Sequence, residues 1–110
     1  MTRPDPGMDA TAARRLAAAA PDRYAVIDLR HGTELGFYAP AGHDPQAPHD
    51  RDELYVIASG RGRFRRGDET VEFAPGDVLF VPAGMPHRFE SFGADFGTWV
   101  LFYGPGRDPA

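Results

Sequence analysis

Short apolar segments, separated by glycine, proline and charged residues, run through most of this sequence. They are rich in valine, leucine, phenylalanine and tyrosine, which is typical of β-strands. Two pairs of segments are joined by short turn-forming links, His31–Thr33 and Gly67–Glu69, and these predict β-hairpins. The pattern therefore predicts an all-β fold of the sandwich or barrel type. The expected strands lie in residues 24–30, 34–40, 53–60, 62–66, 70–74, 77–84, 87–92 and 98–103.

The amino-terminal region has a different composition. Residues 1–8 contain prolines and a glycine, and predict a loose tail. Asp9 stands where an N-cap is expected, before an alanine-rich helix that runs to about Ala20 and is ended by Pro21. We therefore divide the chain into a tail with a short helix (1–22), a β-barrel (23–105) and a C-terminal tail (106–110).

Several expected strands are apolar on both faces. In the segment 53–60, Tyr55 and Ile57 share one face, while Leu54 and Val56 share the other. One face can line the interior of a barrel, and the other then needs a cover. The amino-terminal helix is one possible cover and a second protomer is the other. On this argument we expect a homodimer.

Length and charge narrow the class of protein. The chain has 110 residues, enough for one domain with a hydrophobic core. Its formal net charge of −4 disfavours a general nucleic-acid-binding protein. No apolar run approaches the length of a membrane span, and the amino terminus lacks a signal-peptide pattern. We expect a cytoplasmic protein whose partners include neither nucleic acid nor membrane.

Cysteine and lysine are both absent from the sequence. This excludes disulfides, thiolate nucleophiles, Cys-bound zinc, iron–sulfur clusters and Schiff-base lysines. Any bound metal must be held by histidine, aspartate, glutamate, amide oxygens or water.

One motif lies in residues 76–91, with the sequence GDVLFVPAGMPHRFES. A buried strand that begins after Gly76 runs into Pro82-x-Gly84, which turns the chain sharply. The next strand then begins with His87 on one of its faces. A single histidine on a strand is a weak signal, and its meaning depends on the residues opposite.

A second motif lies in PQAPHDRDE, which covers residues 45–53. If the strand extends back to His49, then His49, Arg51, Glu53 and Tyr55 project to the same face. With His87 from another strand, the set contains two histidines and one carboxylate. Such a set binds borderline divalent metals and leaves coordination positions open for water or substrate.

These two motifs together resemble those of small single-domain cupins. The first cupin motif is Gly-x5-His-x-His-x3/4-Glu-x6-Gly, and His49, Glu53 and Gly60 match its second half. The second is Gly-x5-Pro-x-Gly-x2-His-x3-Asn, which is matched by the four residues Gly76, Pro82, Gly84 and His87. The resemblance implies a double-stranded β-helix, or jelly-roll barrel. It also implies manganese, iron, nickel, copper or zinc held by three histidines and one glutamate.

The sequence departs from the cupin pattern at three positions. Ala47 stands where the family has its first histidine, so only three of the four usual ligands are present. The leading glycine, Gly42, lies one residue closer than the pattern requires, and Ser91 replaces the closing asparagine.

Four interpretations of the gap at Ala47 remain open. In the first, water takes the vacant position, as in the facial triad of non-haem iron oxygenases. In the second, Gln46 binds the metal through its amide oxygen. This resembles zinc-dependent phosphomannose isomerases, which are cupins with a glutamine ligand two residues before a ligand histidine, whereas here Gln46 lies three residues before His49. In the third, His43 reaches in from the loop. In the fourth, the metal is lost. We favour metal binding, with water slightly ahead of Gln46.

Further pocket residues follow from strand parity. Tyr55 is the candidate catalytic residue, as an acid or as a group that orients the substrate. Arg51 could meet an anionic substrate at the mouth of the barrel, or remain solvated beside its acidic neighbours. We assign Gln46, Arg51, Phe89 and Ser91 as candidate cofactor-binding or pocket residues, and His49, Glu53 and His87 as the candidate metal ligands.

These observations favour a metal-dependent enzyme that acts on a small polar molecule inside the barrel, with oxygenase, isomerase or cyclase type chemistry. The expected cofactor is one divalent transition metal: zinc, iron, manganese or nickel. The alternative is a non-catalytic cupin that binds a small molecule with or without a metal.

Overall fold

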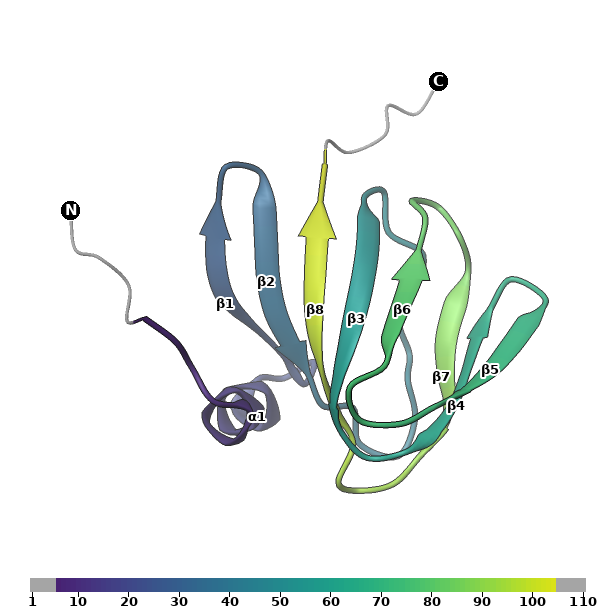
Figure 1. The fold of residues 1–110 in the computed structure, drawn as a ribbon, viewed down its shortest axis with the longest axis horizontal. Coiled ribbons are helices and arrows are strands. Elements are labelled where there is room, and N and C mark those ends of the chain that lie inside the picture. Colours follow the sequence, from purple (N-terminus) through teal and green to yellow (C-terminus); the bar gives the residue numbers. More distant parts are fainter. Residues whose placement is uncertain (1–5, 105–110) are drawn as a thin grey trace.

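A computed structural model describes residues 6–104, in which the chain forms one helix and eight strands (Figure 1). The predicted C-terminal tail and the first part of the predicted N-terminal tail lie outside the described residues. The elements are α1 (Ala10–Ala19), β1 (Tyr24–Arg30), β2 (Thr33–Tyr38), β3 (Asp52–Ser59), β4 (Gly62–Arg66), β5 (Glu69–Phe73), β6 (Val78–Val81), β7 (His87–Phe92) and β8 (Gly97–Tyr103).

The strands form two antiparallel sheets. One sheet has the order β1-β2-β8-β3-β6 and the other the order β5-β4-β7. After β3 the chain crosses to the small sheet for β4 and β5, returns for β6, crosses again for β7 and returns for β8. Figure 1 shows the two sheets facing each other around a common interior. This arrangement confirms the predicted all-β fold, with both expected hairpins in place.

The amino-terminal helix confirms the expected cap and ends at Ala19, one residue before the predicted end. The Asp9 carboxylate accepts a hydrogen bond of 2.8 Å from the Ala12 amide, which satisfies one of the free amides of the first turn. Its buried residues, Ala13 and Ala17, pack against Phe37 on the outer face of the large sheet. The helix is neither long nor apolar enough to cross a membrane.

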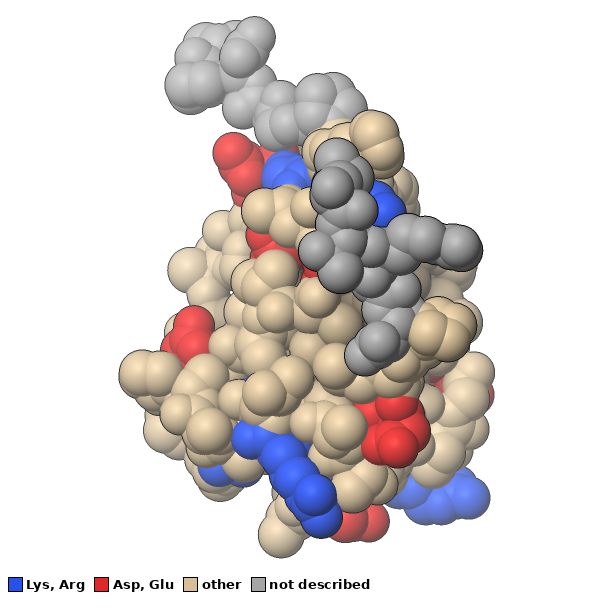
Figure 2. All heavy atoms as spheres, turned by 90° about the vertical axis from the view of Figure 1, so that its left-hand side faces the viewer, with Lys and Arg blue, Asp and Glu red and all other residues tan. Residues whose placement is uncertain are grey.

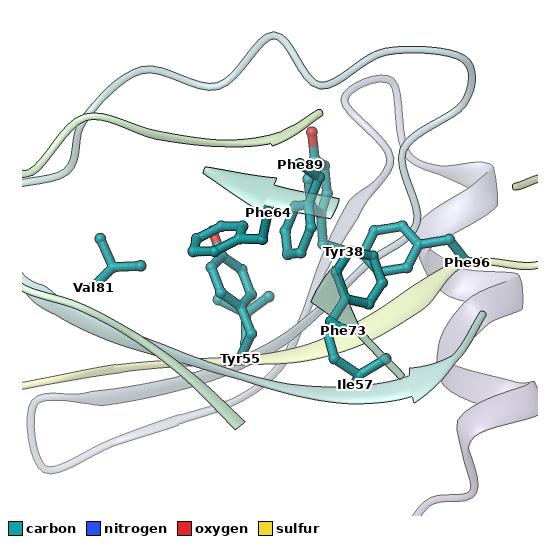
Figure 3. Packing of buried hydrophobic residues seen from close by; sticks show 9 residues of the cluster. Tyr38, Tyr55, Ile57, Phe64, Phe73, Val81, Phe89 and Phe96 are labelled. Carbon is teal, nitrogen blue, oxygen red and sulfur yellow. The ribbon is translucent and has the colours of Figure 1, made fainter. Parts of the chain in front are cut away.

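An aromatic cluster fills the space between the sheets (Figure 3). Tyr55 and Phe89 contact each other with ring centroids 4.8 Å apart, and Phe64 lies within 6 Å of both rings. The cluster consists of Tyr38, Tyr55, Ile57, Phe64, Phe73, Val81, Phe89, Phe96 and Val100. These residues confirm that the inward face of the segment after Glu53 carries Tyr55 and Ile57.

The outer face of the large sheet is also apolar, as the sequence predicted. Two cross-strand rows run over it, Leu35–Leu101–Leu54–Phe80 and Phe37–Trp99–Val56–Val78. The helix covers the end of the second row at Phe37 and Trp99. At the other end of the rows Phe80 remains 58% exposed. We call this surface the outer apolar face.

Charged side chains do not gather on the side of the molecule where α1 and β1 lie. Figure 2 shows this side, on which acidic and basic residues are scattered among uncharged ones. This view therefore gives no indication of a surface patch of one sign.

Candidate metal centre

Three predicted ligands meet at one end of the barrel interior. His49 lies in the segment before β3, Glu53 is near the start of β3 and His87 begins β7. Each offers a donor atom, and the three donor atoms lie within 4.8 Å of one another. Glu53 and His87 are only 1% and 7% exposed, and His49 is half-buried. The structure therefore brings together residues that are far apart in the sequence.

The two motifs are bonded directly to each other at this point. The Gly84 amide donates to the His49 carbonyl at 2.6 Å, and the Ala83 amide donates to the Asp52 carboxylate at 2.8 Å. The turn after Pro82 thus holds the segment that carries His49. Gly84 has a φ of +78°, a conformation that favours glycine at this turn.

His49 reaches the cluster from a different element than the sequence predicted. The expected strand at 53–60 agrees with β3, which begins at Asp52, but the argument that placed His49 on the face of Glu53 required the strand to extend back to His49. Pro45 and Pro48 explain the difference, because neither residue can donate a ladder hydrogen bond and proline disfavours central strands. The parity argument therefore holds for Glu53 and Tyr55 and does not apply to His49.

Glu53 and His87 face each other without forming a hydrogen bond. Glu53 Oε1 lies 3.1 Å from His87 Nε2, yet both atoms are buried and have no hydrogen-bond partner among the described residues. His87 Nδ1 lies 2.9 Å from the Met85 carbonyl, so we assign the ring proton to Nδ1. In this tautomer Nε2 faces a carboxylate oxygen, and either a proton on Nε2 or a bound cation would stabilise the pair.

The surroundings of His87 shift its pKa in opposite directions. Burial by itself lowers the pKa of His87, but the Glu53 carboxylate and the Met85 carbonyl outweigh it, so the pKa is raised overall. The raised pKa favours the protonated form of His87 beside the Glu53 carboxylate. The donor set of two imidazoles and a carboxylate suits a divalent transition metal, so the residues present fit the group that the cupin resemblance implies.

Asp44 is a functional candidate that the sequence reasoning missed. It is 3% exposed and accepts hydrogen bonds from the Tyr38 hydroxyl, the Phe89 amide and both nitrogens of Gln46. Gln46 Oε1 in turn lies 3.3 Å from His49 Nε2. No spacing rule singles out Asp44, since it sits in a proline-rich loop next to the more conspicuous His43.

A cavity of about 470 Å³ opens beside the cluster. Tyr55 contributes its hydroxyl, which donates to Gln46 Oε1 at 3.1 Å. Burial, and then the charge of Glu53, raise the pKa of Tyr55 well above its usual value, so its hydroxyl stays protonated. The lining residues are Asp22, Tyr24, Glu34, Tyr38, Pro45, Gln46, Ala47, Pro48, His49, Glu53, Tyr55, Val100 and Phe102.

Three other predicted pocket residues lie outside this cavity lining. Phe89 is buried in the aromatic cluster. Ser91 is exposed because a bulge interrupts the pairing of β4 with β7. Arg63 pairs with Ser91, but the next residue, Phe64, pairs with Phe89, so side chains of β7 no longer alternate regularly between the inward and outward faces. Arg51 donates to the carbonyls of the β1–β2 turn and of the end of β8, at Gly32, Phe102 and Gly104.

The residues around the gap also have defined places. Ala47 lines the cavity, as the vacant ligand position requires, and offers no donor atom. His43 is exposed and belongs neither to the ligand cluster nor to the cavity lining. Gln46, by contrast, places its side-chain amide oxygen next to the candidate ligand His49.

Comparisons with known proteins agree with these features. The family model described as Cupin domain matches residues 35–102. An uncharacterised protein of Streptomyces coelicolor is 42% identical over 73 residues, which are 64% of this chain and 70% of that protein. Dimethylsulfoniopropionate lyase DddQ of Ruegeria pomeroyi is 35% identical over 69 residues, 61% of this chain but only 34% of the lyase.

Solved structures show the same architecture. A cupin superfamily protein of Desulfitobacterium hafniense has a TM-score of 0.61 at 21% identity, with coverage of 72% of this chain and 73% of that one. A cupin-2 domain protein of Rhodospirillum rubrum has a TM-score of 0.63 at 24% identity, with coverage of 79% and 62%. The jelly-roll barrel predicted from the two motifs is therefore confirmed.

Proposed function

This chain belongs to the cupin family, and from that premise we propose that it binds one divalent transition metal through His49, Glu53 and His87. We further propose that it acts as a metal-dependent enzyme on a small polar molecule. The observation that carries the proposal is the buried pair Glu53 Oε1 and His87 Nε2, 3.1 Å apart and without hydrogen-bond partners in the described structure. A bound metal would supply a Lewis acid or a redox centre at the wall of the cavity.

The chain's own residues supply the rest of the site. The Met85 carbonyl orients His87 through Nδ1, and the Gly84 amide holds the His49 backbone. Tyr55 stays protonated, and its single O–H, which donates to Gln46 Oε1 in this structure, would act on a substrate by exchanging that bond for one to a developing negative charge. The Phe102 ring packs against His49, with centroids 5.0 Å apart.

The cavity lining favours a neutral or positively charged substrate. It includes the acidic side chains of Asp22, Glu34 and Glu53, and none of the lining residues is an arginine. Arg51, the predicted contact for an anion, donates to main-chain carbonyls instead. The similarity to a lyase named for a sulfonium compound supports this substrate class and an enzymatic use of the site. Binding of trimethylammonium or sulfonium compounds should exceed that of matched dicarboxylates.

The proposal predicts close to one metal ion per chain in protein purified without a metal-binding tag. Elemental analysis measures this ratio, and a His43→Ala variant is the matched control because His43 is exposed and outside the cluster. Chelation should abolish turnover of a substrate found in a screen and lower the melting temperature. A chain that carries no metal and gains no stability from added zinc, iron, manganese or nickel would contradict the proposal.

If the metal-free protein keeps its ligand and no turnover is found with metal present, the chain is a binding module. In that case the cavity walls hold the ligand by themselves. This outcome would leave the metal site in place but overturn the enzymatic part of the proposal.

We also propose that the outer apolar face forms a homodimer interface. Its rows of leucine, valine and aromatic residues are covered by α1 at one end only, and Phe80 is 58% exposed. A Phe80→Arg variant should shift the protein from dimer to monomer, measured by light scattering after size-exclusion chromatography. A Val26→Arg variant, at a 53% exposed position on β1, is the control and should stay dimeric. A monomeric wild-type protein would refute this interface.

A further inference from the structure

We infer that Asp44 is a positioning residue that fixes the side-chain amide of Gln46, so that Gln46 Oε1 serves as the fourth metal ligand in place of the histidine missing at Ala47. This inference rests on the proposed function, since it concerns the same metal. It selects one of the alternatives left open by the sequence and adds a residue that no cupin motif contains.

Asp44 is held rigidly by the barrel. Its carboxylate is 3% exposed and accepts from the Tyr38 hydroxyl at 2.6 Å and from the Phe89 amide at 2.9 Å. These partners lie on β2 and β7, one strand from each sheet. The loop that carries the first motif is therefore anchored to both sheets at Asp44.

The remaining bonds of Asp44 go to Gln46. Its Oδ1 accepts from the Gln46 backbone amide at 3.2 Å, and its Oδ2 accepts from Gln46 Nε2 at 2.7 Å. A carboxylate can only accept hydrogen bonds, so the nitrogen of the Gln46 side chain must face Asp44. The amide oxygen must then face the opposite way, and its orientation is fixed by chemistry.

Gln46 Oε1 consequently points toward the ligand cluster. It lies 3.3 Å from His49 Nε2 and 3.1 Å from the Tyr55 hydroxyl. Two donor atoms that share one ion at bonds of about 2.1 Å lie roughly 3.0–3.4 Å apart, so the His49–Gln46 distance fits two ligands of one metal when His49 Nε2 carries no proton, and a hydrogen bond when it does. A carbonyl oxygen has two lone pairs, so it can accept from Tyr55 and still bind a metal.

The alternative occupants of the fourth position fit less well. His43 is exposed and outside the cluster, and Ala47 has no donor atom. With water as the fourth ligand and His49 Nε2 bound to the metal, that nitrogen would carry no proton and would face Gln46 Oε1 without a hydrogen bond. The orientation imposed by Asp44 is most simply explained by direct ligation.

The test is a double-mutant cycle on metal affinity. Asp44→Asn is expected to weaken cobalt(II) binding by about 10- to 100-fold, the range seen when groups that orient metal ligands are removed, and Gln46→Ala by at least as much, because it removes a ligand. Because Asp44 acts through Gln46, the double variant should bind no more weakly than Gln46→Ala alone. His43→Ala is the control, since His43 lies in the same loop but is exposed and outside both the ligand cluster and the cavity lining. Competition titration with a chromophoric chelator measures all four proteins against the wild type.

Two further measurements do not require the Asp44 variant to fold. The visible spectrum of the cobalt(II) protein should change in Gln46→Ala, because the ligand set changes. In the wild-type protein, the Gln46 side-chain N–H that faces Asp44 should exchange slowly with solvent in nuclear magnetic resonance spectra. Rapid exchange of both side-chain protons would overturn the positioning role.

The outcomes separate this inference from the proposed function. If the wild-type chain binds no metal, the proposed function fails and this inference fails with it. If the wild type binds metal and Gln46→Ala has the same affinity and spectrum, only the inference is overturned, and water is the fourth ligand. If the two losses add in the double variant, Gln46 is a ligand but Asp44 does not act through it, and the positioning role is refuted.

Discussion

Replacing Glu53 by glutamine is expected to abolish specific metal binding without lowering the stability of the metal-free protein. The substitution removes the one anionic ligand, so the loss of affinity should exceed the roughly 10- to 100-fold caused by changes outside the ligand set. At the same time it removes a carboxylate that is 1% exposed and whose Oε1 has no hydrogen-bond partner in the described structure. A glutamine side chain can instead donate to the Nε2 lone pair of His87. At a pH high enough to keep His87 neutral the carboxylate is a buried charge without a cationic partner, so the metal-free variant should melt at or above the wild-type temperature there.

Thermal unfolding with chelator and with added metal measures both parts of this prediction. The wild-type protein should gain about 2.7 kcal/mol of stability at a free metal concentration one hundred times the dissociation constant. Glu53→Gln should gain nothing under the same conditions, whereas His43→Ala should behave as the wild type. A Glu53→Gln protein that still gains stability from metal would show that Glu53 is not a ligand. A metal-free variant that melts well below the wild type would show that the carboxylate is needed for the fold itself.

Replacing Phe89 by alanine is expected to destabilise the protein by about 3–5 kcal/mol, the usual cost of removing a fully buried phenylalanine. Its ring lies 4.7 Å from Phe96, 4.8 Å from Tyr55 and 4.9 Å from Phe64, measured between centroids. These rings come from both sheets, so the cavity would open at the centre of the barrel. Since whole domains are stable by only about 5–15 kcal/mol, a large fraction of the chains would be unfolded at elevated temperature.

Urea unfolding measures this loss of stability. Phe89→Leu should cost clearly less than Phe89→Ala, because most of the apolar volume is kept. Val71→Thr at a 47% exposed position on β5 is the control, and it should change stability by no more than about 0.5 kcal/mol. A Phe89→Ala protein as stable as the wild type would contradict the assignment of this ring to the core and would return it to the candidate pocket residues.

Much of the fold could be predicted because local signals and packing agree. Glycine and proline mark nearly every junction, so the strand positions follow from the sequence, and Asp9 marks the start of the helix. Apolar residues on both faces of β3 predicted one face in the core and another that needs a cover. The spacing of Pro82, Gly84 and His87 predicted the turn that brings one candidate ligand to the cluster.

The site was predicted less completely, because its details depend on tertiary contacts. His49 belongs to an irregular segment held by Gly84 across the barrel, which strand parity does not describe. Ser91 leaves the inward face because of a bulge opposite β4, and a bulge has no clear signature in this segment. Asp44 acquires its importance only from Tyr38, Gln46 and Phe89, which the fold brings to it.

The central claim is that His49, Glu53 and His87 hold one metal at the wall of the cavity. Anomalous scattering from a crystal of the metal-loaded protein, recorded on both sides of the absorption edge of the metal, tests it most directly. We expect one strong peak per chain within bonding distance of Glu53 Oε1, His87 Nε2 and a ring nitrogen of His49, together with Gln46 Oε1. A crystal of metal-loaded protein with no peak at this position, or with the peak only at surface carboxylates, would contradict the account.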